Sequence, residues 1–263
     1  MYRRNVGTVR HCGASITVLL LQSDDLSSAA TAAPSIRSGA TGHFRTPGTL
    51  DQNRQSGHRY AARTQLGKGI AVFLNVPDSP EAAAFLERER AAAGYVMNLE
   101  RAWAWRPDIA EAFVALRKQL TDRSTLTARE IAILVCATAR SLGDSYCALA
   151  WGSRLATLAN PAFAAAILEG AGADLLTERE RTLSAWTQQI VRDPNGATRE
   201  QVDALRTAGL ADLEIFEATA FVALRLAFST VNDALGAQPD RQLAEAAPSE
   251  VRSAVSYGRP SSS

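Results

Sequence analysis

The pattern of apolar and polar positions divides the chain into two parts. From Val72 onward, apolar residues recur at helical spacing in one segment after another, each bounded by residues that begin or end helices. Before about Gly69 the chain is rich in Ser, Thr, Gly and Arg, without helical or strand periodicity. We therefore predict a disordered segment 1–71, a helical domain 72–258 and a disordered tail 259–263. Segment 1–71 is either a flexible leader or lies upstream of the natural start of translation.

Capping residues mark the helix boundaries. Ser79 followed by proline begins a helix that Gly94 ends. Thr127 and Glu130 form a capping box, and Gly143 ends the helix that this box begins. The same signals predict helices over about 80–93, 98–105, 108–120, 128–142, 145–158, 178–191, 198–209 and 211–235, and a short helix that begins at Pro161.

The last of these helices, 211–235, carries apolar residues around its whole circumference. Such a helix lies at the centre of a bundle or in an oligomer interface. Arg225 is a lone charge on its apolar surface, and it can pair with a carboxylate, reach a helix end or bind the anionic group of a substrate.

Composition excludes several classes of partner. Of the 263 residues, 46% are hydrophobic and 21% charged, and the formal net charge is +1. No basic face predicts nucleic acid or an anionic membrane surface as a partner. The apolar run 16–21 falls far short of the roughly 20 residues that a membrane span needs.

The distribution of cysteine and histidine argues against metals and cofactors. Three cysteines without a CxxC pair or a Cys/His cluster predict neither a disulfide scaffold nor a zinc site, and they suit a reducing cytoplasm. The histidines His11, His43 and His58 all precede the helical domain. No glycine-rich loop follows a predicted strand, so we expect no nucleotide, flavin or metal.

Cys147 is the residue with the clearest chemistry. If Asp144 caps its helix, Cys147 is the third helical residue, where free amides and the helix dipole favour a thiolate. The charge of Asp144 and the apolar ring of Trp151, one turn along, oppose this effect. Cys147 is therefore either a reactive thiol or a buried, inert one.

The neighbouring candidates each have a structural alternative. Glu130 serves as a capping-box residue or as a proton acceptor, and Asp144 is first a cap. Tyr146 and Trp151 line a substrate pocket or belong to the core. Cys136 is a small core residue unless the turn at Gly143 brings it within a disulfide's reach of Cys147.

Several segments resemble the carboxymuconolactone decarboxylase and AhpD-like alkylhydroperoxidase superfamily, particularly its peroxidase-related branch. These are GYVMNL at Gly94, SYCALAW at Ser145 and the closing stretch 202–240. The resemblance covers the whole helical domain. It implies an all-α, AhpD-like bundle of about seven or eight helices and assembly as a homo-oligomer.

The reactive segment departs from the pattern of the peroxidase members. Those members carry a CxxC pair, a histidine four residues after the second cysteine and an upstream glutamate that relays protons. The second cysteine corresponds to Cys147, the first to Asp144, the histidine to Trp151 and the glutamate to Glu130 at a spacing about two residues longer. A sulfenic acid on Cys147 therefore requires an external thiol.

Three functions follow from this pattern. The leading one is a peroxidase-like thiol oxidoreductase with Cys147 as nucleophile, a small hydroperoxide as substrate and an external thiol as reductant. The second is a cofactor-free decarboxylase-like lyase acting on a small organic acid, although the domain has no histidine. The third is a non-catalytic member that binds a small molecule or acts as a helical oligomer.

Overall fold

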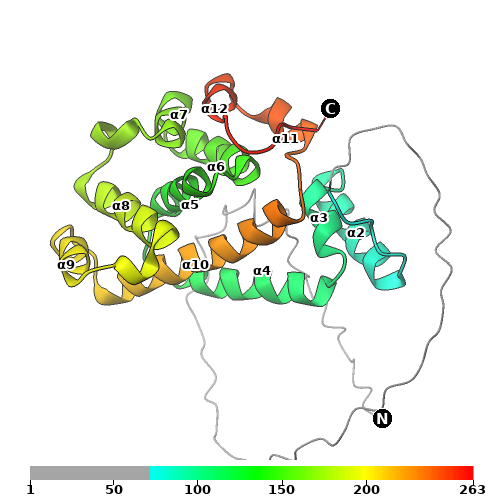
Figure 1. The fold of residues 1–263 in the computed structure, drawn as a ribbon, viewed down its shortest axis with the longest axis horizontal. Helices are drawn as coiled ribbons and strands as arrows, with labels where there is room; N and C mark the ends of the chain where they lie inside the picture. The colour runs from blue at the N-terminus through cyan, green and yellow to red at the C-terminus, as the bar shows by residue number, and fades with distance from the viewer. Residues whose placement is uncertain (1–71, 263) are drawn as a thin grey trace, which may run out of the picture. The chain divides into compact units, whose positions relative to one another are not determined.

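The computed structural model describes residues 72–262, which form helices and no strands (Figure 1). The prediction for segment 1–71 lies outside these residues. The longer helices are α2 (Pro80–Ala93), α4 (Pro107–Asp122), α5 (Ala128–Leu142), α6 (Ser145–Leu158), α7 (Pro161–Glu169), α8 (Glu178–Arg192), α9 (Arg199–Thr207) and α10 (Asp212–Ala234). The shorter elements are α3 (Asn98–Trp103), α11 (Arg241–Ala246), α12 (Ser249–Ala254) and the 3-10 turns η1 (Gly172–Leu175) and η2 (Pro194–Gly196).

Helix α5 is the centre of the bundle. It packs against α6, α7, α8 and α10, and Figure 1 shows α10 lying along α4 beneath this group. The sequence ILVC, from Ile133 to Cys136, is buried on every side because neighbours cover the whole circumference of the helix. None of the described helices is long and apolar enough to cross a membrane.

Local capping explains where the helices begin and end. The Oγ of Ser79 accepts the amide of Ala82 at 3.1 Å, and Gly94 ends α2 at a φ of 83°. The predicted box at Thr127 is present, since each of Thr127 and Glu130 accepts the backbone amide of the other, at 3.1 and 2.7 Å. The predicted helix starts at residues 80, 128 and 145 are confirmed.

The turn between α5 and α6 positions the site. Gly143 has a φ of 73°, the left-handed region that glycine occupies without strain. The amide of Asp144 then donates to the carbonyl of Ala139 at 2.8 Å, which closes the end of α5. Helix α6 therefore begins at once and places Cys147 beside the last turns of α5.

The C-terminal part contains more structure than the sequence predicts. Helices α11 and α12, of six residues each, were not predicted, and α12 packs on α7. The segment that we expected to be a tail lies against the domain. Ser145 Oγ donates to the carbonyl of Arg259 at 2.8 Å, and the amide of Ser262 donates to the carbonyl of Pro239 at 2.8 Å.

Candidate active site around Cys147

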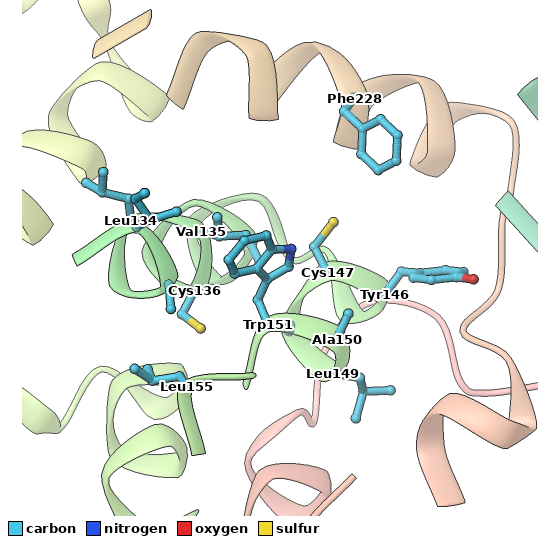
Figure 2. Close-up of a cluster of buried hydrophobic side chains, with 14 of the residues drawn as sticks. Leu134, Val135, Cys136, Tyr146, Cys147, Leu149, Ala150, Trp151, Leu155 and Phe228 are labelled. Carbon is cyan, nitrogen blue, oxygen red and sulfur yellow. The ribbon is translucent and has the colours of Figure 1, made fainter. Parts of the chain in front are cut away.

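Cys147 lies in the first turn of α6, capped as the sequence predicts. Its amide donates to Asp144 Oδ1 at 2.9 Å, and only 1% of the residue is exposed. Figure 2 shows its Sγ pointing away from the α6 backbone, toward α10 and Phe228. The thiol is therefore presented to the side chains of α10.

Arg225 of α10 contacts the thiol directly. Its Nη2 donates to Cys147 Sγ at 2.9 Å, and Ser229 Oγ, one turn along α10, lies 3.7 Å from the same sulfur. Arg225 is fully buried, and its Nε and Nη1 have no hydrogen-bond partner among the described residues. Of the roles open to it from sequence, pairing with a carboxylate is not found among the described residues, and its hydrogen bond goes to sulfur.

Aromatic rings surround the guanidinium. Arg225 Cζ lies 5.6 Å from the ring centroid of Trp151 and 5.1 Å from that of Phe228. A second arginine, Arg117 of α4, lies 5.8 Å from the centroid of Phe228, so two cations flank one ring. Trp151 Nε1 is buried without an acceptor in the described structure. The surroundings of the thiol are thus aromatic and rich in hydrogen-bond donors.

Burial dominates the electrostatics of the thiol. It raises the pKa of Cys147 far above the usual range, Asp144 raises it further, and Arg225 acts in the opposite direction. Burial together with Arg225 lowers the pKa of Arg117 to about 9, so Arg117 stays charged at pH 7. In this closed arrangement the thiol is protonated, and its reactivity depends on the balance between Asp144 and Arg225.

Asp144→Asn should speed alkylation of Cys147 by iodoacetamide at pH 7 several-fold. Asparagine caps helices as well as aspartate does, so α6 keeps its start, but the negative charge beside the sulfur is gone. Because Asp144 raises the pKa of the thiol, its removal lowers that pKa and increases the thiolate fraction at pH 7. Stopped-flow or mass-resolved labelling over pH 6–10 checks this, and an unchanged pH profile would contradict it.

The comparisons with known proteins concern the fold. No family model matches the sequence, and a search of curated proteins gives no match. A peroxidase-related protein from Silicibacter sp. TM1040 is similar with a TM-score of 0.60 and 18% identity, over 68% of this chain and 97% of that one. The AhpD core of a peroxidase-related protein from Ralstonia eutropha JMP134 is similar with a TM-score of 0.57 and 22% identity, over 67% of this chain and 96% of that one. The chain has the AhpD-like fold.

A further protein with this AhpD-like fold is an enzyme. The debrominase Bmp8 is similar with a TM-score of 0.53 and 18% identity, over 71% of this chain and 96% of that one. A cysteine-to-alanine variant of Bmp8, solved in complex with 2,3,4-tribromopyrrole, matches with a TM-score of 0.53 and 20% identity. The all-α, AhpD-like bundle expected from sequence is therefore confirmed.

Glu130 does not join the thiol in this AhpD-like bundle. It begins α5, whereas Asp144 is anchored at Ala139, about 13 Å further along that helix. Its carboxylate accepts the amide of Thr127 at 2.7 Å and Arg179 Nε at 2.6 Å. Glu130 therefore acts as a capping residue. Its carboxylate makes no hydrogen bond to Cys147 in the described structure, as a proton relay would need.

Tyr146 and Cys136 also lie apart from the thiol. Tyr146 projects away from Cys147 in Figure 2, and its hydroxyl donates to the buried carboxylate of Asp240. Cys136 is fully buried, its Sγ points away from that of Cys147, and burial raises its pKa to about 12. Both cysteines are free, buried thiols, and Cys136 is a core residue that forms no disulfide with Cys147.

Sequence reasoning missed three members of the cluster, Ser229, Phe228 and Arg117. Ser229 lies four residues after Arg225, which places both polar side chains on one stripe of an otherwise apolar helix. That spacing is a signal that the sequence contains. Arg117 resembles any helix-surface arginine by its position in sequence, and only the packing of α4 on α10 shows it to be 4% exposed.

Proposed function

We propose that Cys147 is the nucleophile of a thiol-dependent oxidoreductase that reduces a small hydroperoxide. The observation that carries this proposal is the contact of a buried guanidinium with the sulfur, Arg225 Nη2 to Cys147 Sγ at 2.9 Å. A cation at this distance stabilises the negative charge of the thiolate. It also stabilises the negative charge that develops on the leaving oxygen as the sulfur attacks. The AhpD-like fold shared with peroxidase-related proteins supports the same chemistry.

The reaction proceeds by attack of sulfur on oxygen. The Cys147 thiolate bonds to the terminal peroxide oxygen, the O–O bond breaks, and the alkoxide that leaves takes a proton to become an alcohol. Cys147 is then a sulfenic acid. An external thiol condenses with it to a mixed disulfide and releases water, and a second thiol frees Cys147 and leaves as a disulfide.

The requirement for an external thiol follows from the position of Cys136. Its sulfur lies within the core around α5, pointing away from Cys147 (Figure 2). No other cysteine is present among the described residues. In the proposed scheme a small thiol or a dithiol protein supplies both electrons, and Cys12, outside the described residues, takes no part. Assembly as a homo-oligomer stays a prediction.

Hydroperoxide consumption with dithiothreitol as reductant tests the proposed function. Cys147→Ser should reduce turnover to the rate of buffer and thiol alone, whereas Cys136→Ser and Cys12→Ser should leave it within about twofold, since neither thiol takes part in the scheme. Equal turnover by wild type and Cys147→Ser would exclude the proposal. Inactive wild-type protein would favour the non-catalytic binding alternative.

Reductive dehalogenation is a second candidate, favoured by the aromatic rings around the thiol. Trp151 and Phe228 flank Arg225, and the debrominase Bmp8 has the same fold. Here the thiolate takes the halogen, the carbon keeps the bonding pair and gains a proton, and an external thiol displaces halide from sulfur. Release of bromide from 2,3,4-tribromopyrrole, dependent on Cys147, distinguishes this reaction from peroxide reduction.

A further inference from the structure

The cluster around Cys147 has more hydrogen-bond donors than acceptors. Arg225 is fully buried and uses one nitrogen on the sulfur, which leaves Nε and Nη1 without partners among residues 72–262. Trp151, 8% exposed, has its Nε1 buried and likewise without a partner. Figure 2 shows this indole nitrogen on the side of Trp151 that faces Cys147. The unpartnered donors of two helices therefore gather beside the thiol.

The charges in the cluster are predominantly positive. A buried guanidinium is costly unless an anion or a set of acceptors compensates it. Arg225 makes cation–π contacts with Trp151 and Phe228, which offset part of this cost. Arg117 lies 5.8 Å from the centroid of the Phe228 ring and adds a second positive charge, and Arg225 is close enough to lower the pKa of Arg117. Asp144, the N-cap of α6, accepts the amide of Cys147 at Oδ1 and leaves its buried Oδ2 without a partner among the described residues, so one unpartnered acceptor stands against three unpartnered donors.

We propose that this cluster binds a small aromatic anion, whose carboxylate or phenolate accepts from Arg225 and Trp151 Nε1. Resting on the proposed function, the inference names its substrate class: an acidic aromatic molecule that carries the peroxide or halogen near its anionic group. Because Nη1 and Nη2 are bonded to the same carbon, an anion held at Nη1 lies next to the sulfur held at Nη2.

The aromatic part of the ligand has faces to pack against. The rings of Trp103 and Phe113 extend the aromatic surface, stacking on Phe228 at centroid distances of 5.5 and 5.9 Å. Trp151 is 8% exposed whereas Arg225 is fully buried, so displacement of the Trp151 side chain gives a ligand access to Arg225. A planar ring suits this surface better than an aliphatic chain does.

Isothermal titration of the full chain with benzoate and with benzamide tests the inference. The two probes have the same shape and differ in charge. We expect benzoate to bind at least about tenfold more tightly, the difference that a charge-assisted hydrogen bond supplies. Equal affinities, or no binding of benzoate, would overturn the proposal.

Variants assign the binding to the cluster. Arg225→Met should remove the preference for benzoate, and Trp151→Phe, which keeps a ring but lacks the donor, should weaken benzoate several-fold. Arg129→Met is the matched control, because Arg129 also lies over a ring, that of Phe163 at 4.2 Å, but pairs with Glu180. An unchanged preference in both cluster variants would refute the assignment.

The titration is independent of the thiol chemistry. Cys147→Ser should still bind benzoate, even though it cannot turn over peroxide. Benzoate binding without peroxide turnover would refute the proposed function and leave the anion site standing. Peroxide turnover without any preference for benzoate would support the proposed function and refute the anion site.

Discussion

Arg225→Met should slow the oxidation of Cys147 by hydrogen peroxide at pH 7 by about tenfold or more. Each rise of one unit in the pKa of the thiol lowers its thiolate fraction about tenfold. Arg225 lowers the pKa of Cys147 against the effects of burial and of Asp144. Without the guanidinium, only the weaker effect of Ser229 opposes those two, so the pKa of Cys147 rises and the thiolate fraction falls. Hydrogen peroxide is neutral, so the loss reports the thiolate and not the binding of an anion.

The same substitution should leave stability unchanged or higher. Methionine fills apolar space without the desolvation cost of a buried cation, and Arg117 loses a repulsive neighbour. Urea denaturation and stopped-flow oxidation, measured together, check both parts. A large loss of stability, or an unchanged oxidation rate, would contradict the account.

Arg179→Met is the matched control for this experiment. Arg179 donates to Glu130 at 2.6 Å and to Glu214 at 2.7 Å, so its loss breaks ion pairs that join α5, α8 and α10. It belongs to the far end of α5 from Cys147. We expect lower stability with an unchanged rate of Cys147 oxidation, the opposite pattern to Arg225→Met.

Leu134→Ala should destabilise the domain by about 2–5 kcal/mol, the usual cost of removing a large aliphatic side chain from a core. Leu134 lies in the middle of α5, is fully buried, and packs within the helix on which the other helices converge. The cavity cannot collapse easily, because neighbours on several helices hold it open. Urea denaturation monitored by circular dichroism gives the free energy of unfolding.

Leu142→Ala is the control for this substitution. It is the same chemical change in the same helix, but Leu142 is 38% exposed at the C-terminal end of α5. We expect a cost below about 1 kcal/mol, since little apolar surface is returned to water and alanine favours the helix. Equal costs at the two positions would mean that α5 is not the centre of the core.

The sequence predicts the local structure well because capping is local. Ser79, Thr127 and Asp144 each accept an amide three residues along, so the residues that start a helix are visible in the sequence itself. The prediction that Cys147 occupies the first turn of α6 followed from Asp144 alone. Helices α11 and α12 were not predicted, although the equally short α3 was.

The partners of Cys147 could not be predicted in the same way. Arg225 and Ser229 are separated from it by 78 and 82 positions, and only the packing of α10 brings them to the sulfur. Glu130 illustrates the converse. Its proximity in sequence and its resemblance to a relay glutamate suggested a role, yet α5 extends away from Cys147 and carries Glu130 to the other end of the bundle.

Trapping of sulfenic acid shows whether Cys147 is a reactive thiol in the folded protein. The full chain is treated with one equivalent of hydroperoxide in the presence of dimedone, and the adduct is located by mass spectrometry. We expect rapid labelling of Cys147 while Cys136 stays unmodified. Labelling of Cys147 that appears only after the protein is denatured would show a structural thiol and contradict the account.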